Sequence, residues 1–234
     1  MVVITGASSG IGKASAIKFA KKNAKVVLVA RRREKLLQVQ KEISQYTDST
    51  LVCQCDVSNK SQVKEMTDTV IDTFGRIDIL VNNAGFVIYG KVSELTIEEI
   101  ESQMETNYFG MIYCTKNFLP HMVEQDQGHI VNVASVGASF GVPGVASYCA
   151  TKFAMLGFSE GLKHELSGTG VDVTVVSPIM VDTPLFDHPS FENFSRHSTI
   201  AILSPEKVAN TILKAANSSK LEIVVPTIAR AGIW

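Results

Sequence analysis

This chain of 234 residues lacks long apolar runs, paired cysteine motifs and an excess of charge of one sign. No stretch approaches the roughly 18 consecutive apolar residues that a membrane span requires. The apolar opening runs straight into Gly and Ser without a preceding basic segment, which argues against a secretory signal peptide. These absences argue against a membrane protein, and we expect a cytoplasmic one.

Cysteine is scarce, and the few present form no recognisable metal or disulfide pattern. None belongs to a CxxC pair or has a histidine at a matching spacing, so neither a zinc site nor a disulfide framework is predicted. We expect free thiols in a reducing compartment and no metal site. The four cysteines are Cys53, Cys55, Cys114 and Cys149.

Charge is balanced, with 22 Lys and Arg against 23 Asp and Glu and a formal net charge of −1. That balance gives no reason to expect a nucleic-acid partner, which would need a clustered excess of basic residues. Hydrophobic residues make up 45% of the chain and charged residues 19%, a globular composition. Residues 1–234 fit one domain with a substantial core, and no linker or repeat divides them.

Short β-branched runs alternate with helical patterns along the chain. The runs are apolar nearly throughout, as strands buried on both faces must be, so a doubly wound parallel α/β sheet is predicted. Expected strands cover 2–5, 25–30, 49–57, 77–85, 128–135, 171–178 and 221–226. Expected helices cover 11–22, 33–46, 60–74, 96–124 with one break, 147–167 and 204–217.

The longest irregular stretch covers about residues 182–204 and mixes aromatic with polar residues. Long irregular segments within compact domains are usually functional, so we expect a substrate lid here. A simple surface insertion is the alternative. The aromatic and histidine residues of this stretch are Phe186, His188, Phe191, Phe194 and His197.

A glycine-rich turn, TGASSGIGKAS, follows the first strand at residues 5–15. A P-loop would need Gly at Ala7 and Ser or Thr at Ala14, so a triphosphate site is not favoured. Gly6, Gly10 and Gly12 instead resemble a dinucleotide fingerprint, in which a tight turn presents a helix N-terminus to pyrophosphate. A purely structural turn is the alternative for the glycines alone.

Arg31 lies 19 residues beyond Gly12, where a dinucleotide fold recognises the adenosine ribose. An acidic residue there would bind the 2′-hydroxyl of NAD. Arg31, supported by Arg32, suits a 2′-phosphate because a guanidinium is a forked and permanently charged partner. The sequence therefore favours NADP(H) over NAD(H), although Arg32 and Arg33 also fit a solvated helix start.

Tyr148 and Lys152 stand at i and i+4, a spacing that puts both on one helix face, and Ser135 precedes them at a strand end. A lysine ammonium near a phenol favours the phenolate, which would lower the pKa of Tyr148 from its usual value near 10. Tyr148 could then exchange a proton with a carbonyl or alcohol oxygen while Ser135 orients that oxygen. The Tyr–Lys spacing alone is common by chance.

Taken together, these motifs make residues 2–226 resemble the short-chain dehydrogenase/reductase family. The motifs are TGASSGIG at 5–12, Asp56–Val57, NNAG at 82–85, Asn107, Ser135, and Tyr148 with Lys152. The resemblance implies a Rossmann fold with a seven-stranded parallel sheet in the order 3-2-1-4-5-6-7. It implies a catalytic centre of Asn107, Ser135, Tyr148 and Lys152. It also implies that Asn107 kinks its helix and holds a water near the lysine.

The resemblance further implies a cofactor site assembled from the ends of several strands. One position departs from the family pattern, because Ile179 follows Pro178 where glycine is usual, and the backbone path there is open to question. The expected cofactor contacts are Gly6, Ser8, Ser9, Gly10, Ile11, Gly12, Arg31, Arg32, Asp56, Val57, Asn83, Ala84, Gly85, Tyr148, Lys152, Pro178, Ile179, Val181 and Thr183.

These observations lead to an NADP(H)-dependent oxidoreductase that interconverts a carbonyl and an alcohol, with Tyr148 as the general acid/base. A non-catalytic NADP(H)-binding sensor or interaction protein is the alternative, which the intact Ser–Tyr–Lys set argues against. The mixed apolar stretch at 182–204 fits thioesters, steroids, aldehydes and ketones alike. By resemblance, a homodimer or homotetramer is expected.

Overall fold

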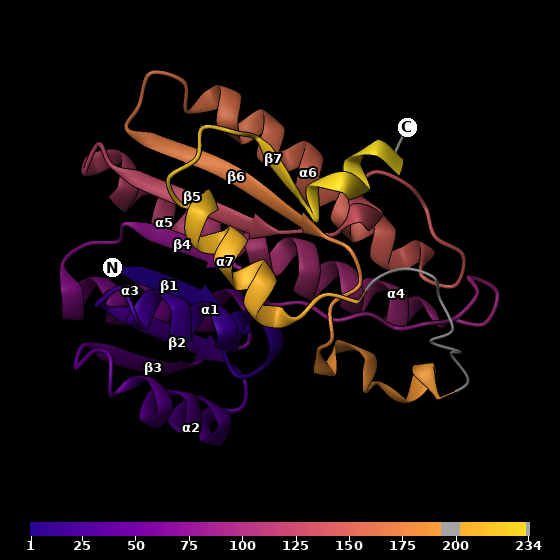
Figure 1. Cartoon of the computed structure of the whole chain (residues 1–234), viewed down its shortest axis with the longest axis horizontal. Helices are drawn as coiled ribbons and strands as arrows, with labels where there is room; N and C mark the ends of the chain where they lie inside the picture. The colour runs from indigo at the N-terminus through magenta and orange to yellow at the C-terminus, as the bar shows by residue number, and fades with distance from the viewer. Residues whose placement is uncertain (193–201, 233–234) are drawn as a thin grey trace.

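The computed structural model describes residues 1–192 and 202–232, and its centre is one sheet of seven parallel strands. The strand order is β3-β2-β1-β4-β5-β6-β7, as predicted (Figure 1). Phe194 and His197 of the expected lid lie outside the described residues. The strands are β1 Val2–Thr5, β2 Val26–Ala30, β3 Thr50–Gln54, β4 Ile79–Asn82, β5 Gly128–Val133, β6 Val171–Pro178 and β7 Glu222–Val225.

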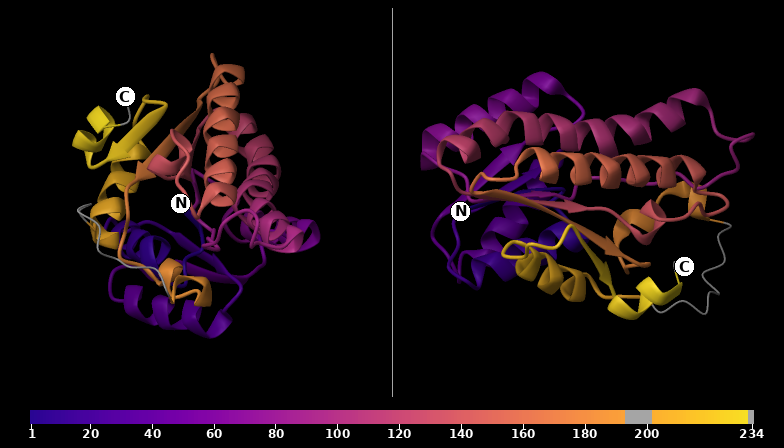
Figure 2. Two further views of the ribbon diagram at one scale, coloured as in Figure 1. Left: turned by 90° about the vertical axis from the view of Figure 1, so that its right-hand side faces the viewer. Right: turned by 90° about the horizontal axis from the view of Figure 1, so that it is seen from above.

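Helices connect the strands and cover both faces of the sheet (Figure 2). The α-helices are α1 Gly10–Ala20, α2 Arg33–Ile43, α3 Lys60–Phe74, α4 Ile97–Met104, α5 Gly110–Glu124, α6 Ala146–Glu165 and α7 Pro205–Ala215. The shorter helical turns are η1 Glu105–Phe109, η2 Val136–Ala138, η3 Pro184–Phe186, η4 Pro189–Phe191 and η5 Thr227–Gly232.

Alternate residues of each strand enter two different cores, because successive side chains point to opposite sheet faces. Val2 and Ile4 of β1 pack in one core with α1, α2 and α7, whereas Val3 packs in the other with α3, α5 and α6. Burial on both faces explains why these strands are continuously apolar. The same arrangement places the carboxyl ends of all strands at one edge of the sheet.

The helix expected at 96–124 is interrupted once, as predicted, and the interruption is the π-helical turn η1. A capping box opens α4, in which the Thr96 hydroxyl accepts from Glu99 N and the Glu99 carboxylate accepts from Thr96 N. The wider π turn inserts one extra residue per turn and is common at functional positions. Asn107 lies within it and is fully buried.

A line of buried polar side chains crosses from β4 to α6. Asn82 Nδ2 donates to Asn132 Oδ1 at 2.9 Å, and Asn132 Nδ2 donates to Ser159 Oγ at 2.8 Å. Asn82 Nδ2 also donates to Thr115 Oγ1 of α5 at 3.2 Å. These hydrogen bonds join β4 and β5 to the helices that cover them.

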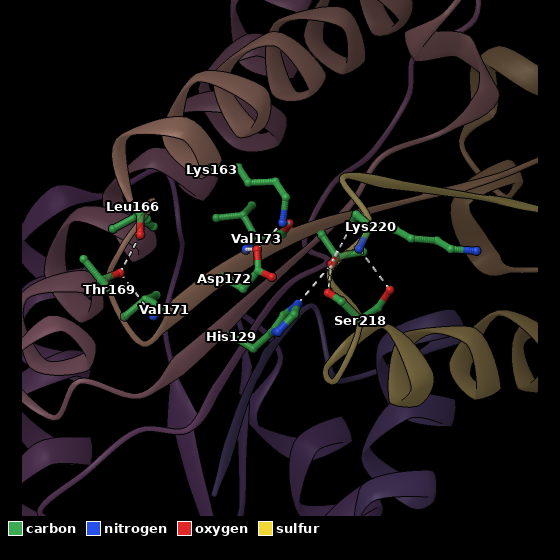
Figure 3. A network of polar contacts seen from close by, with 10 residues as sticks. His129, Lys163, Leu166, Thr169, Val171, Asp172, Val173, Ser218 and Lys220 are labelled. Atoms are coloured by element: carbon green, nitrogen blue, oxygen red, sulfur yellow. Dashed lines mark hydrogen bonds and ion pairs between the residues drawn. The ribbon is translucent and has the colours of Figure 1, made fainter.

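A second polar network lies near the start of β6 (Figure 3). His129 Nε2 is 3.0 Å from Thr174 Oγ1, and that hydroxyl also lies 3.1 Å from Ser218 O and 2.9 Å from Lys220 O. Because the threonine has one hydrogen and uses it on a carbonyl, His129 must donate from Nε2. The network thereby ties β5 and β6 to the turn between α7 and β7.

Candidate active site

The glycine turn between β1 and α1 can exist only without side chains at its glycines. Gly6 and Gly10 have φ angles of +65° and +52°, and a Cβ on Gly12 would lie 2.3 Å from Gly6 O. Ser9 precedes α1 and, among the described residues, its side chain caps no N–H of this helix. The N–H groups of the first turn and the helix dipole at this end favour a negatively charged group.

Thr5 holds the neighbouring turn after β4 against the glycine turn. Its hydroxyl accepts from Asn83 N at 2.9 Å and Ala84 N at 3.0 Å, and donates to Val81 O at 3.3 Å. Asn83 Nδ2 adds a hydrogen bond to Thr5 O at 2.9 Å. Sequence reasoning missed Thr5, although a polar residue that ends a buried strand was a usable signal.

The two arginines after β2 occupy different positions. Arg32 Nη2 donates to Ser8 Oγ at 3.1 Å and to Ser9 Oγ at 3.3 Å, so its guanidinium lies over the glycine turn. Arg31 is 70% exposed, and its Nη1 lies 4.0 Å from Asp56 Oδ2. The sequence predicts Arg31 as the main 2′-phosphate ligand with Arg32 in support. In the structure Arg32 contacts the predicted pyrophosphate turn, and the role of Arg31 stays a prediction.

The remaining predicted cofactor residues lie along the same edge of the sheet. Asp56 accepts from Ser58 N at 3.0 Å, and Val57 is buried against Gly110 of α5. Ile179 donates from its N–H to Val225 O at 2.9 Å, so the chain leaves β6 paired with β7 despite the absence of the usual glycine. Thr183 then approaches the first turn of α1, where a Cβ on Gly10 would lie 3.0 Å from Thr183 Cγ2.

Ser135 and Tyr148 meet just beyond the end of β5. Ser135 Oγ accepts from Gly137 N at 3.1 Å, which leaves its hydrogen available for donation, and the Ser135 hydroxyl acts to lower the pKa of Tyr148. Tyr148 is half-buried in the first turn of α6, where the helix dipole favours a negative phenolate. The pair can therefore hold and orient one oxygen atom between two hydroxyl groups.

Lys152 lies one turn further along α6 and is almost fully buried. Its Nζ donates to Val133 O at 3.0 Å and lies 5.5 Å from the centre of the Tyr148 ring. A Cβ on Gly85 would lie 3.8 Å from this nitrogen, so the turn after β4 also reaches Lys152. The ammonium thus lies between Tyr148 and the predicted cofactor edge.

Burial controls the pKa values of this pair. It raises the pKa of Tyr148 to about 12 against the opposing hydrogen bond from Ser135, and it lowers the pKa of Lys152 to about 8. The expected lowering of the tyrosine pKa by lysine is therefore not found. The reason is that the loss of hydration at this half-buried phenol outweighs the effect of Ser135, which favours its phenolate.

Asn107 is held by both ends of its side-chain amide. Its Oδ1 accepts from Phe86 N at 2.9 Å, and its Nδ2 donates to Phe86 O at 2.9 Å and to Thr151 Oγ1 at 3.2 Å. A Cβ on Gly85 would lie 3.0 Å from Asn107 Oδ1. The π turn, the segment after β4 and α6 therefore meet at Asn107.

The expected lid is described over residues 182–192 and 202–204, where two 3₁₀ turns bring an aromatic cluster together. The ring centroids of Tyr89 and Phe191 are 5.5 Å apart, and those of Phe186 and Phe191 are 5.3 Å apart. Tyr89 N also donates to Ser190 Oγ at 2.9 Å. Tyr89 was missed because its partners are about a hundred residues away in sequence.

Comparison with known proteins identifies the family to which this arrangement belongs. The family model described as short chain dehydrogenase matches residues 1–191. The chain belongs to the short-chain dehydrogenase family. An uncharacterized oxidoreductase of Staphylococcus aureus strain USA300 is 37% identical over 220 residues, 94% of this chain and 92% of the relative. One from Staphylococcus haemolyticus is 37% identical over 215 residues, covering 92% and 90%.

Solved structures of similar proteins carry nicotinamide cofactors. A serine dehydrogenase complexed with NADP+ is 30% identical with a TM-score of 0.88, covering 95% of this chain and 93% of that one. A Burkholderia phymatum short-chain dehydrogenase/reductase in complex with NAD is 26% identical with a TM-score of 0.90, covering 99% and 90%. This short-chain dehydrogenase is thus an oxidoreductase by family, with the fold of cofactor-bound relatives.

Two further observations on the described residues concern metals and membranes. No group of three or more His, Cys, Asp or Glu residues there could hold a metal ion. Within residues 1–192 and 202–232, no helix combines the length and apolarity that crossing a bilayer requires.

Proposed function

We propose that this short-chain dehydrogenase transfers a hydride between NADP(H) and a carbonyl or alcohol substrate. The observation that carries the proposal is the meeting of Ser135, Tyr148 and Lys152 at the sheet edge that also bears the glycine turn. The bound cofactor supplies or accepts the hydride. The two hydroxyl groups hold the substrate oxygen, and Tyr148 gives it a proton during reduction or removes one during oxidation.

The residues at the glycine turn fit a dinucleotide. The bare glycines let the backbone approach a pyrophosphate, and the N-terminus of α1 favours its charge. Arg32 with Ser8 and Ser9 offers donors for an additional phosphate, which supports NADP(H) over NAD(H). Lys152 would hydrogen-bond the nicotinamide ribose, and Asp56 with Val57 would contact the adenine.

Asn107 is proposed to act with this set by holding a water near Lys152 through its backbone. Its amide is already occupied by Phe86 and Thr151, so the side chain fixes the turn instead of contacting substrate. Replenishment of the tyrosine proton would then run through Lys152 and this water. Residues 182–204 are proposed to cover the substrate, with Tyr89, Phe186 and Phe191 as an apolar wall.

We also propose a homodimer or homotetramer that forms through α5 and α6, and one catalytic domain over residues 1–234. Phe109, the last residue of η1 before α5, and Phe153 of α6 support the assembly because they are 37% and 45% exposed. A cytoplasmic location is supported by the four cysteines, which are free and buried. Burial raises the pKa of the Cys53 thiol to about 11, which keeps it protonated.

The test is a screen of NADPH and NADH oxidation against carbonyls of several classes, with wild type beside Tyr148→Phe. The variant should lose about 10²–10⁴-fold in kcat/KM because it lacks the transferable proton. Its NADPH Kd, measured by fluorescence titration, should stay close to wild type. Retained turnover in the variant would overturn the role of Tyr148. Tight NADPH binding by wild type without hydride transfer to any carbonyl would favour a sensor.

A further inference from the structure

Thr151 occupies the turn of α6 between Tyr148 and Lys152, and it is 1% exposed. Its hydroxyl donates to Tyr148 O at 2.7 Å and accepts from Asn107 Nδ2 at 3.2 Å. No sequence motif singled out this residue. Its contacts nevertheless join the two segments that carry the proposed proton relay.

The hydrogen bonds around Thr151 can run in only one direction. Asn107 Nδ2 has two hydrogens, and Phe86 O takes one while Thr151 Oγ1 takes the other. The threonine has a single hydrogen, and its acceptor is the Tyr148 carbonyl. Phe86, Asn107, Thr151 and the Tyr148 backbone therefore form a directed chain without a spare donor.

This chain connects three segments of the site. Phe86 follows the turn after β4, Asn107 belongs to η1, and Thr151 belongs to α6. A threonine hydroxyl that bonds back to a carbonyl in the preceding turn also bends a helix locally. The position of Tyr148 relative to Lys152 thus depends on a hydroxyl group that touches neither reacting atoms nor cofactor.

We propose that Thr151 is a positioning residue that sets the spacing of Tyr148, Lys152 and the Asn107 turn for proton transfer. The inference rests on the proposed function, in which Tyr148 exchanges the substrate proton. Without the hydroxyl, Asn107 Nδ2 loses one of its acceptors, and the Tyr148 carbonyl loses the hydrogen bond that it accepts from Thr151. Tyr148 is then held less well against the Ser135 hydroxyl, which favours its phenolate, and the apparent pKa of the catalytic acid/base rises.

The experiment compares Thr151→Val, which keeps the side-chain shape and removes the hydroxyl, with Thr151→Ser, which restores it. For alcohol oxidation, Thr151→Val should lower kcat about tenfold, a size expected from a small misplacement of reacting groups. It should also move the acidic limb of the kcat–pH profile upward by about half a pH unit or more. Thr151→Ser should return both quantities to near wild type, and NADP+ affinity should stay unchanged in both variants.

Thr115→Val is the matched structural control. Thr115 is equally buried and its Oγ1 accepts from the Asn82 amide at 3.2 Å, but it belongs to the polar line beneath the site. Thr115→Val should lower Tm as Thr151→Val does, but it should leave kcat and the kcat–pH profile at wild-type values. Thr151→Ala serves the same comparison if Thr151→Val does not fold.

Two results would overturn the inference. One is a wild-type kcat and pH profile in the hydroxyl-free Thr151 variant. The other is an equal kinetic loss in Thr115→Val, which would mean that any buried hydroxyl of this region matters only for stability. Failure of the proposed function looks different, because wild type itself would then show no turnover that depends on Tyr148.

Discussion

Arg31 and Arg32 are adjacent after β2, yet their guanidinium groups have different neighbours. Arg32 lies over the hydroxyls of Ser8 and Ser9, whereas Arg31 is mostly exposed and only approaches Asp56. A phosphate placed at the serine pair would receive a forked guanidinium and the helix N-terminus together. Arg32 is therefore the residue that we expect to distinguish NADPH from NADH.

Replacing Arg32 with Gln should raise the Kd for NADPH by about tenfold or more, since a hydrogen bond to a charged group contributes about 1.5–3 kcal/mol. The Kd for NADH should hardly change, because NADH has no 2′-phosphate. Fluorescence titration with both cofactors measures this, and Arg33→Gln at the next exposed position is the control. An equal loss of NADH affinity would show that Arg32 instead supports the turn itself.

At the residue scale, sequence reasoning succeeded where a fixed spacing determines geometry. Tyr148 and Lys152 share a helix face at i and i+4, so their proximity was predictable. Thr151 was missed because the value of its hydroxyl depends on Asn107, 44 residues away. The direction of the Tyr148 pKa was also missed, since burial is set by tertiary packing and not by the neighbouring lysine alone.

Among the elements, the two 3₁₀ turns η3 and η4 depend on contacts outside their own segment. Ser190 accepts from Tyr89 N and lies 2.8 Å from His188 Nδ1, while Phe191 packs on the Tyr89 ring. Gly144, just before α6, approaches the same ring so closely that a Cβ would lie 2.4 Å from it. The proposed lid, the segment after β4 and the start of α6 thus converge at Tyr89.

Ser190→Ala should loosen this junction and raise the KM for the carbonyl substrate about threefold to tenfold, from the loss of roughly 1 kcal/mol of hydrogen bonding. NADPH affinity should remain at the wild-type value, because the serine lies away from the glycine turn. Steady-state kinetics measure both, with Ser44→Ala at the end of α2 as the control. A parallel loss of NADPH affinity would contradict a role confined to the lid.

The helices and strands were predictable from sequence wherever the local hydrophobic periodicity determines them. One break in the helix expected at 96–124 was predicted, but its π-helical form was not. The π turn places Asn107 against Phe86 and Thr151, and neither partner is local in sequence. Residues 182–204 show no hydrophobic periodicity, so the packing of Phe191 on the Tyr89 ring could not be predicted from sequence.

For the whole molecule, the network in Figure 3 joins β5, β6 and the α7–β7 turn through His129. Burial lowers the pKa of His129 below the ordinary 6.5, with Asp172 opposing that shift and Lys163 adding to it. Asp172 and Lys163 are themselves in close ionic contact. A protonated imidazole would be poorly hydrated at this position, so the folded state favours the neutral ring.

The free energy of unfolding should consequently fall as pH drops below 6.5 toward the lower folded-state pKa of His129. Between these two pKa values the unfolded chain binds a proton that the folded chain does not. The stability that neutral His129 contributes is therefore complete above pH 6.5 and is lost once the pH falls below the folded-state pKa. His129→Gln should reduce the slope, which for one group is at most about 1.4 kcal/mol per pH unit. Urea unfolding across this range measures it, with exposed His164→Gln as the control. Equal slopes in wild type and His129→Gln would refute the assignment.

The buried amide line from Asn82 to Ser159 has a consequence for how the sheet assembles. Runs of Val, Ile and Leu in adjacent parallel strands are chemically alike, so apolar burial alone distinguishes poorly between pairings that differ by two residues. Asn82 is paired with Asn132 across β4 and β5, and a shift by two would put the Asn82 amide beside Ile130 or Ala134. Such a misaligned sheet would separate the two amides and bury Asn132 Oδ1 without the donor that it has in the native pairing. The asparagine pair thus favours the native register of β4 and β5, because other registers would bury unpaired polar atoms.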